Sequence, residues 1–172
     1  DPHTGRRYVT SELYRTGLTA REQAQLTLAT EAPPDEYSWT SADPSMWNMS
    51  GVTSIRGLES RSPADDYRDE GIYLRPAMNA RKPGWNNVRT ALALLPDGKP
   101  GLQVCSTCTN LIRTLPMMIH DPNNQDDLQD DHAEDHGVDS LRYGISLVDV
   151  SREKRKAKRS GYRISHQRVA AR

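Results

Sequence analysis

The segment from Glu134 to Tyr143 places carboxylate and imidazole side chains close together in the sequence. If the segment is helical, Asp139 lies one turn after both Asp135 and His136, because residues three and four apart are neighbours on a helix surface. A rigid helix that carries carboxylates in its first turns is suited to hold a divalent cation, which prefers oxygen ligands. The segment therefore predicts a cation site at the start of a helix.

An apolar stripe predicts how this helix is held in place. Four apolar residues recur at the spacing of one helix face: Val138, Leu141, Ile145 and Val148. Such a face packs on a hydrophobic core. Arg142 lies one turn after Asp139, so we expect it to be a structural ion-pair partner of Asp135 or Asp139 rather than a catalytic group.

The remaining elements follow from apolar periodicity and from Pro and Gly positions. The expected strands are Arg7–Tyr14, Tyr37–Ala42, Ile72–Leu74 and Leu102–Cys105. The expected helices are Thr19–Thr30, Ala64–Glu70, Trp85–Leu95 and Asn110–Leu115. Residues 50–63 are expected to be irregular and residues 122–131 an acidic loop. Strands that alternate with helices indicate an α/β sheet with helices packed on its faces.

Two local signals are more specific. Thr19 followed by Glu22 is the pattern of a capping box at a helix start. Asp43-Pro44-Ser45 is typical of a turn from a strand into a helix, with Asp43 as N-cap and proline at the first helical position. The three tryptophans (Trp39, Trp47 and Trp85) are expected in the core or covering the sheet.

Composition limits the class of protein. The chain has 172 residues and no Phe, which fits one domain with a modest core. No apolar run is long enough to span a bilayer, and the first five residues lack the features of a signal peptide. Two cysteines, Cys105 and Cys108, are too few for a disulfide framework, which fits a reducing cytoplasm.

The net charge of zero conceals a strong separation of charge. Eight acids and no Lys or Arg lie between Asp121 and Asp139, whereas nine bases and one acid lie between residues 151 and 172. A cation-binding patch beside a basic segment fits a metal-dependent enzyme that acts on nucleic acid. The other interpretation is an acidic loop and a solvated tail that balance each other.

The sequence resembles the C-terminal nuclease domain of bacteriophage terminase large subunits over residues 5 to 146. The stretches that carry the resemblance are Gly5–Val9 with Glu12–Tyr14, Ala42–Trp47, Asn79–Arg81 with Gly84–Trp85, Cys108–Pro116 and Glu134–Tyr143. The last stretch, Asp-His-x-x-Asp-x-Leu-Arg-Tyr, is the most specific. The resemblance implies an RNase H/integrase-like mixed sheet flanked by helices in residues 1–150, followed by a basic tail in residues 151–172.

The resemblance also implies a function and a site. The family cuts double-stranded viral DNA concatemers during genome packaging, as an endonuclease with two divalent metals, Mg²⁺ or Mn²⁺. Asp43 matches the second catalytic carboxylate, Asp139 the third, and His136 the histidine one turn before it, so all three are expected at the metal site. Basic side chains directly after the helix are expected to bind DNA phosphates: Lys154, Arg155, Lys156, Lys158 and Arg159. They could instead form a flexible linker or a surface that contacts the portal.

One part of the family pattern is missing from this sequence. The first catalytic aspartate would lie on a strand before residue 5, so the chain holds two of the three carboxylates and is expected to lack one or two strands. No phosphate-binding loop of an ATPase occurs. The partners implied are double-stranded DNA, the terminase ATPase domain, the small terminase subunit and the portal, in the cytoplasm of a bacterial host.

Two alternatives remain open. Cys105 and Cys108, with His132 and His136, have spacings that could make a zinc site, as in a module that binds DNA without cutting it. The long segment between the pairs is unlike a zinc finger, which favours a buried cysteine pair at a strand end. The other alternative is a catalytically inactive fragment of the nuclease.

Overall fold

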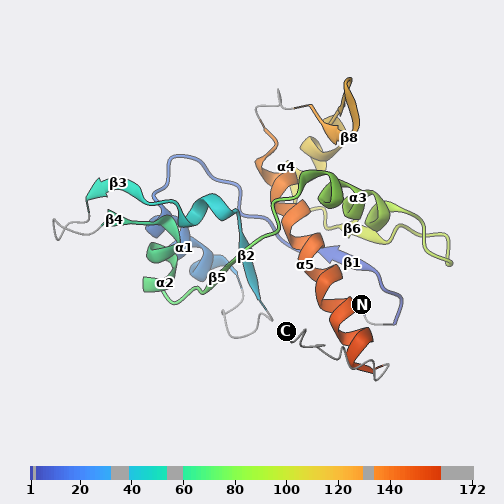
Figure 1. Ribbon diagram of the computed structural model, residues 1–172, viewed down its shortest axis with the longest axis horizontal. Coiled ribbons are helices and arrows are strands. Elements are labelled where there is room, and N and C mark those ends of the chain that lie inside the picture. Colours follow the sequence, from blue (N-terminus) through green and yellow to red (C-terminus); the bar gives the residue numbers. More distant parts are fainter. Residues whose placement is uncertain (2, 32–38, 54–59, 130–133, 160–172) are drawn as a thin grey trace, which may run out of the picture.

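The computed structural model describes residues 1, 3–31, 39–53, 60–129 and 134–159, and only the backbone for residues 50–53, 60 and 149–159. Its elements form two groups (Figure 1). The α1 lobe contains α1 (Ala20–Thr30), β2 (Thr40–Ala42), η2 (Pro44–Trp47), β3 (Ser50–Thr53), β4 (Ser60–Arg61), α2 (Pro63–Asp69) and β5 (Leu74–Pro76). The α5 lobe contains β1 (Arg7–Val9), α3 (Arg81–Leu92), β6 (Leu102–Val104), α4 (Thr109–Thr114), η3 (Leu115–Met117), β7 (His120–Asp121), β8 (Asn124–Leu128) and α5 (His136–Arg159).

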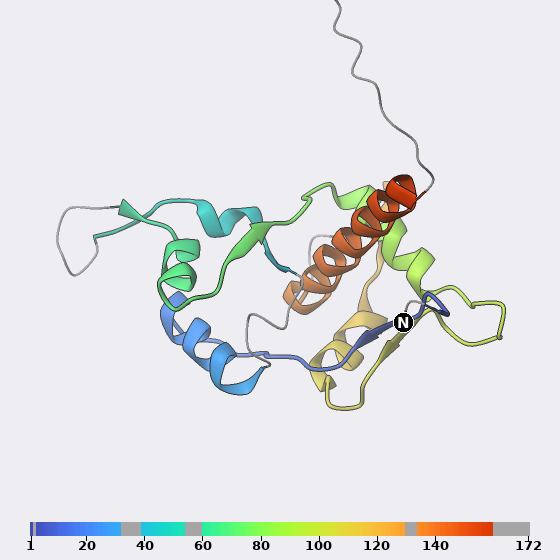
Figure 2. The same cartoon turned by 90° about the horizontal axis from the view of Figure 1, so that it is seen from below.

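Each lobe has its own hydrophobic core. In the α5 lobe, apolar residues of α3, β6, α4 and α5 pack together: Trp85, Val88, Ala91, Leu102, Cys108, Leu111, Val138 and Ile145. In the α1 lobe, the smaller core is made by Ala24, Tyr67 and Ile72. Because the two clusters do not merge, the position of one lobe relative to the other depends on contacts such as those between α5 and β2 (Figure 2).

The strands of the described part form four sheets of two strands each. β1 pairs in parallel with β6, and β2 pairs in parallel with β5. β3–β4 and β7–β8 are antiparallel pairs. The predicted mixed α/β class is therefore confirmed, with small sheets and helices. Among the described residues, no helix is long and apolar enough to cross a membrane.

The predicted helix starts are confirmed where a cap marks them. The Thr19 hydroxyl accepts from the backbone of Glu22, and the Glu22 carboxylate accepts from the backbone of Thr19, so the capping box of α1 is present. The predicted start of α3 at Trp85 is wrong, since the helix begins at Arg81. Proline at position 83 is tolerated there because the first-turn N–H groups have no partner within a helix.

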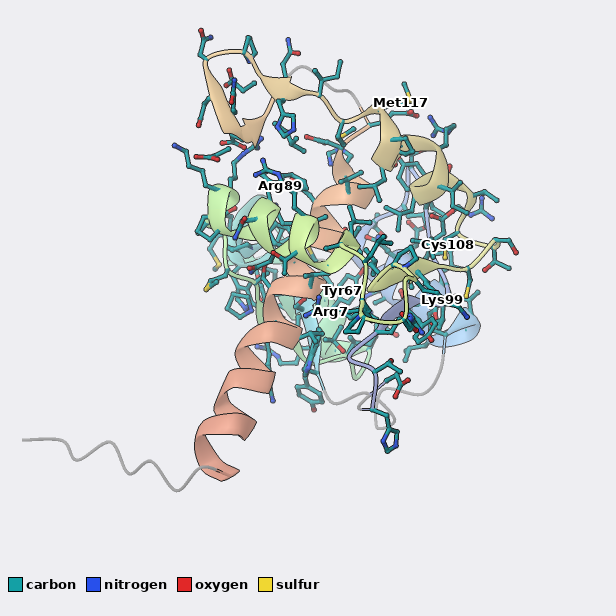
Figure 3. All side chains as sticks on the ribbon, turned by 90° about the vertical axis from the view of Figure 1, so that its right-hand side faces the viewer. Arg7, Tyr67, Arg89, Lys99, Cys108 and Met117 are labelled. Carbon is teal, nitrogen blue, oxygen red and sulfur yellow. The ribbon has the colours of Figure 1, made fainter. Side chains whose placement is uncertain are left out.

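The predicted acidic loop is wrong, because residues 120–128 form the hairpin β7–β8. Two arginines of α3 bind β8. Arg81 Nε lies 3.1 Å from Asp127 Oδ1. Arg89, which is labelled on α3 in Figure 3, donates to the Gln125 carbonyl. This neighbouring positive charge compensates carboxylates that sequence reasoning assigned to solvent. The expectation of irregular structure in residues 50–63 is also wrong in part, since β3 and β4 form there.

The predicted apolar stripe of α5 is confirmed for three of its four residues, whereas Val148 is half-buried and lies outside the core cluster. Val138 and Ile145 are buried in the core of the α5 lobe, and Leu141 packs against it. The helix runs without interruption from His136 to Arg159, across position 150. β1 is shorter than predicted and ends at Val9. The Glu12 carboxylate, beyond the end of this strand, accepts from the N–H of Asn110 in α4.

Candidate functional site

The turn between β2 and η2 positions Asp43. β2 ends at Ala42, and Asp43 is the N-cap of η2, with proline at the first position as predicted. Its Oδ1 accepts from the backbone N–H of Ser45 at 2.7 Å. The carboxylate is therefore fixed at the carboxyl end of a parallel strand, where polar side chains of α/β sheets commonly gather around ligands.

The start of α5 positions the second carboxylate. His136 is the first residue of the helix, and Asp139 lies in its first turn. The Asp139 N–H donates to the Asp135 carbonyl at 2.8 Å, which continues the helical pattern one turn outward. Both side chains therefore project from the amino end of one helix.

The fold brings the three predicted residues together. Asp43 from one lobe, and His136 and Asp139 from the other, line one pocket of about 360 Å³. The remaining lining residues are Ser41, Ala42, Ser45, Ser140 and Tyr143. Two acids far apart in the sequence thus meet at the junction of the two lobes.

Tyr143 contacts Asp43 directly and was missed by sequence reasoning. Its hydroxyl donates to Asp43 Oδ2 from a ring that is buried. Burial, followed by this hydrogen bond to a carboxylate, raises the pKa of Tyr143 to about 12. Its position four residues after Asp139, on the same helix face, was the signal available in the sequence.

Arg142 holds Asp139. Its Nε donates to Asp139 Oδ1 at 3.0 Å, so one of the two predicted partners is confirmed. The side chain is 1 % exposed and lies over the rings of Trp85 and Tyr143, at 5.3 and 4.4 Å from their centroids. Its buried Nη1 has no hydrogen-bond partner among the described atoms. The aromatic faces partly replace the lost hydration, since a guanidinium is attracted to a ring face.

Asp43 is held in its ionised form. Hydrogen bonds from Ser45 and Tyr143, with the positive charge of Arg142, lower the pKa of Asp43 and outweigh the opposing effect of burial. Donors that bond the charged form of a carboxylate stabilise that form. Asp43 therefore carries a negative charge at neutral pH, as a residue that binds a cation requires.

Asp43 and Asp139 are the two side chains of the pocket that could hold a hydrated divalent cation. Carboxylate oxygens are the ligands that Mg²⁺ prefers, and Mg²⁺ usually keeps several waters while only one or two carboxylates bind it. Within the described ranges, no three His, Cys, Asp or Glu side chains are close enough to form a complete metal cluster. His136 is 86 % exposed and lies 3.5 Å from Asp135, so it stands at the rim of the pocket.

The cysteines are not arranged as the zinc alternative requires. Cys108 is buried and Cys105 is exposed, so the expected buried pair is right for Cys108 and wrong for Cys105. Burial raises the pKa of the Cys108 thiol, which disfavours the thiolate that zinc would bind. The fourth predicted ligand, His132, lies outside the described residues. Among the described residues, no three His, Cys, Asp or Glu side chains are grouped so that they could hold a metal ion.

The other predicted residues fall in three places. Trp85 is buried in the core as expected, and Trp39 and Trp47 are half-buried. The predicted DNA-binding residues Lys154, Arg155, Lys156, Lys158 and Arg159 lie on the last turns of α5, and their side chains are outside the described part.

A second, larger pocket adjoins the first. It has a volume of about 620 Å³, lies between the segment of residues 7–16 and α5, and shares His136 and Ser140 with the smaller pocket. Glu12 closes one side by accepting from the backbone N–H groups of Asn110 and Leu111 at 2.7 and 2.9 Å. Sequence reasoning missed this role of Glu12, which joins residues 98 positions apart.

Comparison with known proteins gives no relative for this chain. No family model matches it, and neither a curated protein nor a solved structure matches at a significant level.

Proposed function

We propose that this chain is the metal-dependent endonuclease domain of a phage packaging terminase, with an RNase H-like fold. The observation that carries the proposal is the shared pocket of Asp43, His136 and Asp139. Each of the three is also a position that the sequence resemblance assigns to the metal site. Two parallel strand pairs with α5 packed beside them support the fold assignment.

The residues would divide the reaction between them. Asp43 and Asp139 would bind the cation through their oxygens. A bound divalent cation supplies Lewis acidity, which activates water and stabilises the leaving oxygen of a phosphodiester. His136, which is exposed at the rim of the pocket, would take a proton from water or give one to the leaving group.

The basic residues on the last turns of α5 would bind the DNA backbone. Contacts of this kind are independent of sequence and weaken steeply with salt. The proposed partners are double-stranded DNA, the terminase ATPase domain, the small terminase subunit and the portal. The proposed location is the cytoplasm of the bacterial host.

A plasmid-nicking assay tests the proposal. We expect a longer native polypeptide that contains this chain, and with it the first carboxylate of the family pattern, to nick supercoiled plasmid with Mg²⁺ or Mn²⁺. Asp139→Asn and Asp43→Asn should each lower this activity about 100-fold, because each removes a charged ligand. Asp126→Asn is the matched control, since this acid is exposed on β8 and lies outside the pocket. Equal nicking by Asp139→Asn and the wild-type chain would disprove the assignment.

The second candidate function is a nuclease-derived domain that binds DNA without cutting it. It is favoured by the absence of a complete metal cluster within the described residues. The same assay separates the two candidates when it is repeated with this chain alone. Salt-dependent DNA binding with no nicking in either preparation would support the second.

A further inference from the structure

The two carboxylates of the pocket belong to lobes with separate cores. Asp43 lies in the α1 lobe, where Met46 of η2 packs on the core made by Ala24, Tyr67 and Ile72. Asp139 lies on α5, and the preceding residue, Val138, is fully buried in the core of the α5 lobe. Neither core by itself determines the distance between these two side chains.

Tyr143 connects the two lobes at the pocket. It belongs to α5, and its hydroxyl donates to Asp43, 100 positions earlier in the chain. Its ring is 6 % exposed and lies 4.4 Å below the guanidinium of Arg142, which in turn holds Asp139. Two consecutive residues of one helix therefore fix the two carboxylates, one each.

These hydrogen bonds leave the carboxylates able to bind a cation. An ionised carboxylate has about four acceptor positions, two on each oxygen. Ser45 takes one position on Oδ1 of Asp43, and Tyr143 takes one on Oδ2. Partners that orient metal ligands in this way typically change metal affinity 10- to 100-fold when they are removed.

We propose that Tyr143 is a positioning residue that holds Asp43 beside Asp139, so that one divalent cation binds both carboxylates. The inference rests on the proposed cation-binding role of the pocket. Tyr143 itself does not contact the cation. Removal of its hydroxyl uncouples the two carboxylates while both remain present.

The test follows Mn²⁺ binding by NMR without DNA, because Mn²⁺ broadens the resonances of nearby amides. In the wild-type chain, the amides of Ser45, beside Asp43, and Ser140, beside Asp139, should broaden at the same Mn²⁺ concentration. In Tyr143→Phe, Ser140 should still broaden, whereas Ser45 should require about tenfold more Mn²⁺. Tyr67→Phe is the matched control, since it removes a hydroxyl from the core of the α1 lobe, and it should retain the wild-type pattern.

The outcomes separate this inference from the proposed function. Joint broadening in both the wild-type chain and Tyr143→Phe would overturn the positioning role and leave the cation site intact. Failure of both amides to broaden in the wild-type chain would overturn the cation site, and with it the proposed function. Separate broadening in Tyr143→Phe alone supports the inference.

A second measurement covers the case in which Tyr143→Phe does not fold. In the wild-type chain, a tyrosine hydroxyl that donates to a carboxylate should exchange slowly and give a downfield proton resonance. This resonance should shift as Mg²⁺ is added, because the cation draws charge from Asp43. Its absence, or its indifference to Mg²⁺, would overturn the positioning role.

Discussion

Gly84 of α3 lies directly against the side chain of Arg142 of α5. A Cβ atom at Gly84 would lie 2.8 Å from Cγ and 2.9 Å from Cδ of Arg142. Arg142 cannot move aside easily, because it is buried, lies over Trp85 and donates to Asp139. The close contact between α3 and α5 thus fixes the residue that holds one of the two pocket carboxylates.

Gly84→Ala should therefore destabilise the protein. Alanine in a helix normally gains up to about 1 kcal/mol over glycine, but overpacking of a filled site costs about 1–3 kcal/mol. We expect a net loss of about 1–2 kcal/mol in the free energy of unfolding. Urea denaturation followed by circular dichroism measures it.

Gly144→Ala provides the opposite control within α5. A Cβ at Gly144 would meet no atom within 4 Å. The substitution should therefore raise the free energy of unfolding by up to about 1 kcal/mol, as helix propensity predicts. Equal effects of the two substitutions would contradict the contact between Gly84 and Arg142.

Arg142→Met should lower the free energy of unfolding more than the substitution of an exposed arginine does. The variant keeps an apolar stem but loses the bond to Asp139 and the stacking on two rings. Breaking a buried ion pair costs about 3–5 kcal/mol, and because Asp139 remains partly hydrated we expect about 2–3 kcal/mol. Arg68→Met is the control, since Arg68 pairs with Asp65 at the surface and should contribute less than about 1 kcal/mol. Comparable losses would show that the burial of Arg142 contributes little.

Asp43→Asn should lower the pKa of Tyr143. In the folded protein, burial and then the hydrogen bond to the Asp43 carboxylate raise this pKa from 10.0 to about 12. The stability that the neutral hydroxyl contributes is full below pH 10.0 and is lost as the pH rises through about 12. Ultraviolet titration of tyrosinate should show one tyrosine that titrates at lower pH in the variant. Superimposable titration curves would argue against the contact.

Glu12→Gln should destabilise the protein at neutral pH and much less in acid. Burial favours a raised pKa, but hydrogen bonds from the backbone and side chain of Asn110 and from Leu111 hold the pKa of Glu12 below its ordinary value of 4.5. Its contribution is thus present above pH 4.5 and is lost as the pH falls through the lower folded value.

We expect a loss of about 1 kcal/mol at pH 7, typical of a helix cap, and a smaller difference as the pH falls below the ordinary pKa of Glu12 and through its lower folded value. Urea denaturation of both chains across this range measures it. A difference that is constant with pH would exclude the ionised carboxylate as the cap of α4.

The sequence alone predicted the local features in which residues close along the chain bond to each other or share one helix face. The capping box of Thr19 and Glu22 and the N-cap role of Asp43 are confirmed, because each depends on contacts within about one turn. The apolar stripe of α5 is visible in the sequence because its residues recur at the helical period. The pairing of Arg142 with Asp139 is local in the same sense. The sequence also predicted that His136 and Asp139 lie on one helix, and α5 contains both.

Only the tertiary structure decided what lies opposite these elements. Tyr143 donates to Asp43, and Glu12 accepts from N–H groups of α4. Both contacts join residues about 100 positions apart, and no periodicity encodes such pairs. The acidic segment became the β7–β8 hairpin because Arg81 and Arg89 of a distant helix supply the opposing positive charge and donors. Sequence alone thus gave the candidate ligands, whereas the packing of two separate cores determined that Asp43 and Asp139 share a pocket.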